Sequence, residues 1–500
     1  MFKKVLFLII ITSQLISLGQ DYRYTNTLFP SSTKTSNVVY GTAPFIDGPF
    51  YTVESSTTAQ SLLMDIYKPT GDTFSLRPAI IFAHSGGFLL GSKNADDMSS
   101  LCDSLARKGY ITATIDYRMG FNLVGNTALH STRAVYRALQ DGRTAVRFLR
   151  ANATLYGIDP SKIYFVGSSA GSFMALHAIY LDTLSEKPVL AGVSNYFNIT
   201  FPFTHTAPDL GGLDIGNNLT YNGKPDAVIA MWGAIQNTTF ITADNTTPVF
   251  LIHGDEDPYV PFNTGSPFGL ASLPETQGSN PINNKLNVLG FTNKETYFVS
   301  GQGHEFYGVT NGTWNNGNGG NEYWPIIINK SAQFLWKQHK PFADFLSETN
   351  NLTTTFTNTS IGNLNCWWDF GDGNYSNETN PTHTYINSGN YQVKLYIENN
   401  IKSWDEITKS ITITALSTIS QSLNKFTIAP NPTSDLIFVT FNYKPEGVKF
   451  ELNDISGKTL SKNTMLTTSN EISLENYAKG IYILKILTED NTQIYKIIKQ

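Results

Sequence analysis

The chain has 500 residues, of which 41% are hydrophobic and 15% are charged, and its formal net charge is −5. This length is too great for one core and predicts about three domains, while the hydrophobic content excludes an intrinsically disordered protein. The mild negative charge, with no dense Lys/Arg cluster, argues against nucleic-acid binding.

The first 19 residues have the pattern of a secretory signal peptide. Lys3 and Lys4 form a basic start, an apolar run covers residues 5–11, and the small residues Ser17 and Gly19 stand where a signal peptidase needs them. The apolar run is too short to cross a bilayer, and no other segment approaches roughly 20 apolar residues. We therefore expect cleavage after Gly19 and a mature protein without a transmembrane segment.

The chain has only two cysteines, Cys102 and Cys366, and they fall in different predicted domains. Two such residues can build neither a disulfide framework nor a cysteine-based metal site. We expect two unpaired, buried thiols.

From about residue 60 to 340, strand-like runs alternate with helical stretches, which predicts a parallel α/β sheet. The expected strands are 62–67, 79–83, 111–116, 163–166, 227–232, 249–252 and 296–299. The expected helices are 96–108, 132–152 and 331–339. In the helix 132–152, apolar residues recur at near-helical spacing, and the polar side carries Asp141, Arg143, Arg147 and Arg150.

Ser169 is the candidate nucleophile. It lies in Gly167-Ser168-Ser169-Ala170-Gly171, directly after the apolar run 162–166 and before the small-residue helix 172–176. This is the strand–turn–helix context of a G-x-S-x-G nucleophile elbow, in which flanking glycines let strand and helix approach closely.

His304 is the candidate base. In the chain order Ser, acid, His that α/β-hydrolases follow, only His304, His339 and His383 lie downstream of the acid candidates. His383 belongs to the β-rich tail and His339 ends a predicted helix at a domain boundary. His304 lies in a glycine-rich loop after the last predicted strand, where a base can be presented at the carboxyl edge of the sheet.

The candidate acid lies after the predicted strand 249–252, in His253-Gly254-Asp255-Glu256-Asp257. The stretch resembles the hydrolase pattern H-G-x-x-D-x-x-V-P, and this match favours Asp257 over Asp255. For Asp255 and Glu256 we expect turn-forming hydrogen bonds and solvated charge.

An oxyanion intermediate needs N–H donors. One is the backbone N–H of Ala170, next after the nucleophile. The loop His84-Ser85-Gly86-Gly87-Phe88 follows an early strand and resembles the H-G-G-G-F motif of hormone-sensitive-lipase-like esterases, with Ser85 replacing the first glycine. Carried over by position, Gly86 and Gly87 supply the other donors.

Residues from about 40 to 340 thus resemble an α/β-hydrolase-fold carboxylesterase near the hormone-sensitive-lipase and acetylxylan/feruloyl esterase groups. Segments 115–118 and 138–145 resemble the D/N-Y-R segment and the pre-elbow helix of those enzymes. The resemblance implies a serine esterase that works through an acyl-enzyme, with no metal or organic cofactor, on acyl or feruloyl esters of polysaccharides. A polyester or lipid-ester hydrolase and a catalytically inactive surface adhesin are the alternatives.

Residues 194–224 separate the elbow helix from the next predicted strand and are rich in aromatic side chains: Tyr196, Phe197, Phe201 and Phe203. These either line an acyl pocket or pack a small core of the insertion itself. Trp232, at the end of a predicted strand, has the same two interpretations.

After Pro341 the sequence becomes dense in Asn, Thr and Ser and shows short alternating strands. The run 367–373, Trp-Trp-Asp-Phe-Gly-Asp-Gly, resembles a PKD domain, which implies an Ig-like β-sandwich over residues 341–415. We expect Asp369 and Asp372 to cap turns there in preference to binding a metal.

A polar linker is expected at residues 416–424, followed by a second β-sandwich domain at 425–500. Segments 429–432, 452–458, 477–482 and 495–499 resemble the C-terminal sorting domain of the bacterial type IX secretion system. The resemblance implies export by that machinery from a bacterium, with release or attachment at the outer cell surface. The expected architecture is a signal peptide (1–19), an α/β-hydrolase fold with a mostly parallel sheet (20–340) and two β-sandwich domains.

Overall fold

The computed structural model describes residues 22–47, 53–122, 125–198, 202–317, 319–362, 365–414, 426–488 and 491–500. The predicted signal peptide and linker lie outside these residues. The chain divides into two compact units, Met1–Thr414 and Ala415–Gln500.

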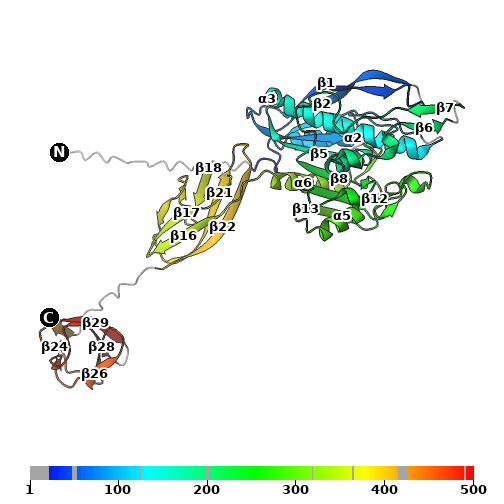
Figure 1. The fold of residues 1–500 in the computed structure, drawn as a ribbon. Coiled ribbons are helices and arrows are strands. Elements are labelled where there is room, and N and C mark those ends of the chain that lie inside the picture. Colours follow the sequence, from blue (N-terminus) through cyan, green and yellow to red (C-terminus); the bar gives the residue numbers. More distant parts are fainter. Residues whose placement is uncertain are drawn as a thin grey trace, which may run out of the picture. The chain divides into compact units, whose positions relative to one another are not determined.

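A sheet of eight strands organises the first part of the described chain, with β1 and β2 at one edge and β13 at the other (Figure 1). In spatial order its strands are β1 (Ser32–Ile46), β2 (Thr57–Pro69), β4 (Ile111–Ile115), β3 (Arg77–Ala83), β5 (Ile158–Ser168), β8 (Ala227–Met231), β10 (Val249–Gly254) and β13 (Lys294–Val299). β1, β2 and β4 pair antiparallel, and all pairs from β4 to β13 are parallel. The predicted mostly parallel α/β sheet is confirmed.

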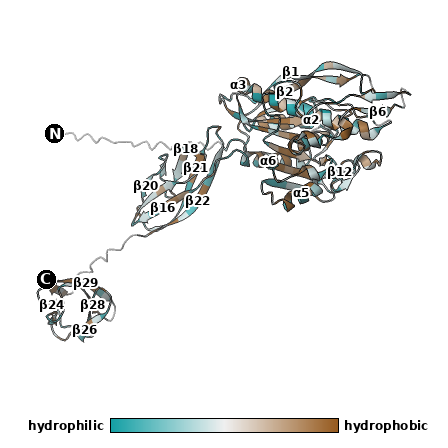
Figure 2. Ribbon diagram, viewed as in Figure 1, coloured by the Kyte–Doolittle hydropathy of each residue, from teal (hydrophilic) through white to brown (hydrophobic). Residues whose placement is uncertain are grey.

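Hydrophobic layers cover both faces of this sheet, whose strands are predominantly hydrophobic (Figure 2). Alternate residues of β3 point to opposite sides, because side chains of a strand alternate: Ala79 and Ile81 join one core cluster, and Ile80 and Phe82 join the other. The first cluster is shared with α2 (Thr127–Ala151), α4 (Ala170–Tyr180) and α5 (Ser279–Val288). The second is shared with α1 (Asp96–Ala106) and α6 (Tyr323–Lys337).

Shorter elements decorate this layer structure. They are α3 (Ala153–Tyr156), the 3-10 turns η1 (Leu184–Glu186), η2 (Val189–Ala191), η3 (Thr238–Phe240) and η4 (Pro267–Gly269), and the small strands β6 (Ser194–Phe197), β7 (Thr204–Ala207), β9 (Ala234–Ile235), β11 (Thr264–Gly265), β12 (Thr276–Gly278), β14 (Val309–Thr310) and β15 (Thr313–Trp314). None of the described helices is long and apolar enough to cross a membrane.

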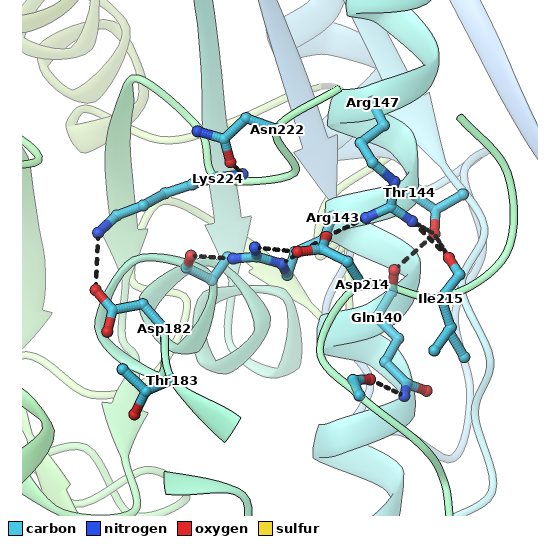
Figure 3. Close-up of polar contacts among 12 residues, drawn as sticks. Gln140, Arg143, Thr144, Arg147, Asp182, Thr183, Asp214, Ile215, Asn222 and Lys224 are labelled. Atoms are coloured by element: carbon cyan, nitrogen blue, oxygen red, sulfur yellow. Dashed lines mark hydrogen bonds and ion pairs between the residues drawn. The ribbon is translucent and has the colours of Figure 1, made fainter. Parts of the chain in front are cut away.

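The polar side of α2 is buried under the segment that connects α4 to β8. Asp214 of this segment forms ion pairs with Arg143 and Arg147, and the Arg147 guanidinium also donates to the carbonyl of Ile215 at 2.6 Å (Figure 3). Gln140 donates to the carbonyl of Gly212 at 2.7 Å. Burying guanidinium groups is tolerable because each finds carboxylate or carbonyl partners. The polar stripe of α2 therefore anchors the insertion.

Two of the motifs quoted above bind each other. The guanidinium of Arg118, from segment 115–118, donates to both carboxylate oxygens of Asp141 on α2, and the Arg118 backbone N–H donates to the same carboxylate at 2.8 Å. Both side chains are only 2% exposed. This pair links the end of β4 to the helix that precedes the elbow.

Residues 343–414 form two packed antiparallel sheets. One contains β16 (Phe345–Asn350), β17 (Thr353–Asn358) and β20 (Thr382–Thr384), and the other β18 (Asn365–Asp369), β19 (Tyr375–Ser376), β21 (Gly389–Glu398) and β22 (Trp404–Ile413). Trp368 is fully buried at their centre. Asp369 and Asp372 accept the backbone N–H groups of Gly371 and Asn374 at 2.9 and 3.0 Å, so both cap turns as predicted.

These sheets contact the eight-stranded α/β part of the first unit through an aromatic interface. The Tyr24 hydroxyl donates to the carbonyl of Ile401 at 2.6 Å, and Tyr24 is completely buried. Trp404 packs against Tyr22 and Trp336 with ring centroids 4.6 and 4.7 Å apart, and its indole N–H donates to the carbonyl of Arg23 at 3.0 Å. The eight-stranded α/β part and the sheets of residues 343–414 therefore belong to one unit.

The second unit is again two antiparallel sheets around its own core. One sheet contains β23 (Phe426–Ala429), β24 (Leu436–Phe441) and β27 (Ser469–Ser473), and the other β25 (Lys449–Asn453), β26 (Thr459–Thr464), β28 (Gly480–Leu487) and β29 (Thr492–Lys499). The expected α/β architecture followed by β-rich domains is thus confirmed. Cys102 and Cys366 are both buried and unpaired, as predicted.

Candidate active site

The predicted elbow forms between β5 and α4. Ser169 stands alone between them with φ +52°, a left-handed conformation that is costly for a residue with a Cβ and that concentrates at functional positions. The flanking glycines permit the turn: a Cβ on Gly167 would lie 2.1 Å from the carbonyl oxygen of Gly171, and one on Gly171 would lie 2.2 Å from that of Ala83. The turn presents Ser169 beyond the carboxyl end of a central strand.

The predicted donor loop lies beside the elbow, directly after β3. Gly86 and Gly87 have φ +115° and +61°, and a Cβ on Gly86 would lie 2.0 Å from the carbonyl oxygen of Leu90. Within the described part of the chain, no acceptor binds the backbone N–H groups of Gly86, Gly87 or Ala170. Gly87, Ala170 and Ser169 line the same pocket. These N–H groups are therefore available to a ligand near Ser169.

Asp257 and His304 meet at the same edge of the sheet, in the loops that follow β10 and β13. Nδ1 of His304 lies 2.6 Å from Oδ2 of Asp257. The other carboxylate oxygen accepts the backbone N–H groups of Tyr259 and Val260 at 2.8 and 2.9 Å. The Asp257 side chain is fully buried and that of His304 is 9% exposed. An imidazole held this way keeps its proton on Nδ1 and leaves Nε2 able to accept one.

The ionised form of Asp257 is strongly favoured. Burial alone would raise the pKa of its carboxyl, but hydrogen bonds from His253 and His304 outweigh burial and hold the pKa well below its ordinary value. His253 also binds the hydroxyl of Ser279 at 2.8 Å and the carbonyl of Val260 at 3.2 Å. His253 therefore supports the turn.

Asp255 has a different role from Asp257. It is exposed, and its carboxylate accepts the backbone N–H of Gly301 at 2.7 Å. This bond closes the turn that leads to His304. Of the carboxylates considered in this loop, the structure brings Asp257 to the imidazole and leaves Asp255 as a turn former.

Trp232 links the elbow to the His304 loop. Its indole N–H donates to the hydroxyl of Ser168 at 2.9 Å, and its ring lies 6.1 Å from the imidazole of His304, centroid to centroid. Trp232 is completely buried. It belongs to the core cluster shared with α1 and α6 and is absent from the described lining of the pocket beside Ser169, so it packs the core of the sheet and neither of its two interpretations holds. Sequence reasoning did not find the bond to Ser168, because the partners are 64 residues apart.

An apolar pocket that is open to solvent extends from Ser169. Its wall includes Phe88, Phe121, Val135, Leu139, Phe173 and Leu181. His177 also lines it, but burial lowers the pKa of this imidazole to about 4, so it is neutral near pH 7. The pocket therefore suits an uncharged, apolar group.

The aromatic side chains of the insertion do not form this pocket. Tyr196 is buried in a small cluster with Leu129 and Ala207, whereas Phe197 and Phe203 are 58% and 69% exposed. None of these three is among the described residues that line the pocket, and Phe201 lies outside the described residues. Of the two interpretations, a small core therefore holds for Tyr196 alone.

No group of three or more His, Cys, Asp or Glu side chains suited to a metal ion occurs in the described ranges.

Comparison with protein families gives three matches. Residues 64–198 match BD-FAE, residues 343–415 match the PKD domain, and residues 427–500 match the secretion system C-terminal sorting domain. The first match contains the donor loop and the elbow.

The chain is also similar to curated proteins. A juvenile hormone esterase from Heliothis virescens is 36% identical over 115 residues, which are 23% of this chain and 20% of that protein. A probable isoprenylcysteine alpha-carbonyl methylesterase from Oryza sativa subsp. japonica is 28% identical over 178 residues, 34% of this chain and 38% of that protein. The chain thus spans between a fifth and two fifths of the length of these two relatives.

Among solved structures, the apo form of Thermogutta terrifontis esterase 2 is 18% identical, with a TM-score of 0.38 over 62% of this chain and 95% of that one. Three separate regions of the chain thus match family models: residues 64–198 match BD-FAE, residues 343–415 match the PKD domain and residues 427–500 match the secretion system C-terminal sorting domain.

Proposed function

We propose that this protein is a secreted serine esterase whose nucleophile is Ser169, whose base is His304 and whose acid is Asp257. The observation that carries the proposal is the 2.6 Å bond between His304 and Asp257 at the sheet edge where the strained elbow presents Ser169. The esterase names of the curated relatives support the same reaction class.

The residues divide the reaction among them. Nε2 of His304 takes the proton of the Ser169 hydroxyl as the oxygen attacks the ester carbonyl, and Asp257 stabilises the imidazolium that forms. The same proton then passes from Nε2 to the departing alcohol oxygen as the C–O bond breaks. Water, deprotonated by His304, attacks the acyl-enzyme, the bond between the Ser169 oxygen and the acyl carbon breaks, and the Ser169 oxygen takes the proton from Nε2 as the acid is released. The oxyanion of each tetrahedral intermediate is held by the N–H groups of Gly86, Gly87 and Ala170.

The proposed substrates are acyl or feruloyl esters of polysaccharides. The apolar pocket beside Ser169 suits a small alkyl or an aromatic acyl group, because it offers shape and contact without charge. Chain-length profiling tests this against the lipid-ester alternative: a preference for long-chain acyl groups would count against carbohydrate esters.

The sorting domain indicates export by the type IX machinery to the cell surface or the medium. We propose that the signal peptide at residues 1–19 first directs the chain across the inner membrane. Detection of the mature enzyme in the periplasm of a strain whose copy lacks residues 427–500 would support this order of steps.

Active-site labelling tests the esterase assignment. The wild-type protein should react with a fluorophosphonate probe and hydrolyse p-nitrophenyl acetate, and Ser169→Ala should lose both. Ser161→Ala is the control: it removes an exposed hydroxyl of the same strand, β5, and should retain labelling. Wild-type protein that neither labels nor turns over would instead favour the inactive adhesin.

A further inference from the structure

Two large aromatic side chains, Tyr259 next to the His304 imidazole and Phe268 next to Tyr259, are half-exposed. The Tyr259 ring is 5.4 Å from that of His304, edge to face at 84°, and 5.9 Å from the ring of Phe268. Tyr259 is 49% exposed and Phe268 is 42% exposed. Single exposed aromatics are common on protein surfaces, but this pair is adjacent to the proposed base.

The backbone holds this pair in place. The N–H of Phe268 donates to the carbonyl of Tyr259 at 2.7 Å, and Phe268 has φ +57°, which is strained for a bulky residue. The N–H of Tyr259 binds Asp257, the carboxylate that also holds His304. The position of Tyr259 is thus fixed relative to the imidazole, and Phe268 is held next to Tyr259 in a backbone conformation that is costly for a bulky residue.

The acyl and alcohol parts of an ester substrate lie on different sides of Ser169. The apolar pocket is lined by Ser169, Gly87 and Ala170, and its described lining includes Phe268 but neither Tyr259 nor His304. An acyl group whose carbonyl oxygen meets the N–H donors therefore extends into this pocket. The alcohol must leave toward His304, which gives it a proton, and that is the side on which Tyr259 lies.

We propose that Tyr259, packed against Phe268 at the border with the acyl pocket, forms a subsite for the alcohol half of the substrate, and that this alcohol is a sugar ring stacked on the Tyr259 ring. The subsite rests on the esterase function proposed above. A sugar has an apolar face of C–H groups and an edge of hydroxyls, so it can cover an aromatic ring while its hydroxyls stay in water. Half-exposed rings on loops that also carry the exposed polar residues Asn263 and Thr264 fit such a group. An alkyl alcohol would gain more from an enclosed wall, such as the one on the acyl side.

Paired substrates test the subsite in the full-length protein. An acetylated methyl xyloside and methoxyethyl acetate share the acyl group and differ only in the alcohol, so both pass through the same acyl-enzyme. Tyr259→Ala should lower kcat/KM about tenfold for the acetylated xyloside and about twofold or less for methoxyethyl acetate, because it removes a stacking face. Tyr259→Phe keeps the ring and should restore the xyloside value. Tyr221→Ala, at a tyrosine of similar exposure (43%) on the insertion, should change neither value.

Each other outcome overturns the subsite. An equal loss on both substrates in Tyr259→Ala would show that Tyr259 acts only by positioning His304. Unchanged kcat/KM values for both substrates in Tyr259→Ala would show that the ring does not contact the alcohol. Wild-type protein that labels with a fluorophosphonate but ignores the xyloside would refute the sugar subsite and leave the esterase proposal standing. Wild-type protein that fails to label would end both.

Discussion

Asp257 binds the imidazole of His304 with one carboxylate oxygen and the backbone of the Tyr259–Val260 turn with the other. The same side chain thus orients the proposed base and fixes the loop that carries the aromatic pair. A change at this carboxylate should affect both.

Asp257→Asn is expected to lower kcat by about 10³- to 10⁴-fold, because an amide favours the wrong imidazole tautomer and does not stabilise the imidazolium. Asp255→Asn is the matched control, two residues away and exposed, and should retain activity within about threefold. Steady-state kinetics on p-nitrophenyl acetate measures both. A larger loss in Asp255→Asn than in Asp257→Asn would reverse the assignment of the acid.

Gly171→Ala is expected to destabilise the protein by about 3 kcal/mol or more and to reduce activity, since the new Cβ would lie 2.2 Å from the carbonyl oxygen of Ala83. The strand or the elbow helix must shift, and Ser169 moves with it. Gly212→Ala is the control, because a Cβ there meets nothing within 4 Å and the backbone is not left-handed. Urea unfolding and esterase kinetics of both variants give the comparison; equal stabilities would contradict the close packing of the elbow.

Trp404→Ala is expected to lower the free energy of unfolding of the first unit by about 3 kcal/mol, because it removes the ring packed between Tyr22 and Trp336. Tyr375→Ala, at a 53% exposed residue of the PKD domain, should change stability by less than about 0.5 kcal/mol. Thermal unfolding followed by far-ultraviolet circular dichroism measures the stability of both variants. Identical melting temperatures would mean that the interface contributes nothing to stability.

Acid should weaken the same interface through His339. This imidazole is buried against the hydroxyls of Tyr110 and Ser403. Burial, helped by the charge of Lys162, lowers its pKa from 6.5 to about 3. The unfolded chain therefore binds a proton that the folded chain refuses, so the stabilisation is complete above about pH 6.5 and falls as the pH drops toward 3.

At about pH 4.5 this single group should cost about 3 kcal/mol relative to pH 7. His339→Gln removes this titrating group. The unfolding free energy of the variant should therefore fall less steeply with decreasing pH than that of wild type, and the two slopes should differ by up to about one bound proton. Denaturant titrations at several pH values compare the variant with wild type. Parallel curves would mean that His339 is not held neutral in the folded protein.

Local chemistry explains which features could be predicted from the sequence. The elbow, the donor loop and the acid–base loops are short segments whose glycines and polar residues are required by the turn itself, so they are recognisable without a structure. The central strands were predicted because they are uniformly apolar. β1 was not, because it is an exposed edge strand rich in Ser, Thr and Asn with two bulges. α5 was missed because Ser279-Asn280-Pro281-Ile282-Asn283 lacks a helical apolar pattern.

Features that depend on distant partners could not be predicted. The arginines of α2 were identified as a polar side, but the sequence cannot show that Asp214 and the carbonyls of the insertion cover them. The aromatic residues of that insertion allowed two interpretations, because the sequence does not show whether a given ring is exposed or buried. The pairing of Tyr259 with Phe268 depends on a backbone turn that no motif marks.

The interface around Tyr24 has a consequence for how the molecule matures. Tyr24 and Ile401 are 377 positions apart, and Arg23 and Trp404 are 381 apart. A polypeptide synthesised only as far as residue 340 holds every group proposed for the chemistry, yet its amino-terminal tyrosines still lack the surface that covers them. The contacts that bury these tyrosines form only when the last strand of the PKD domain has been made. The protein therefore reaches its full resistance to heat and proteases only after synthesis has passed residue 404.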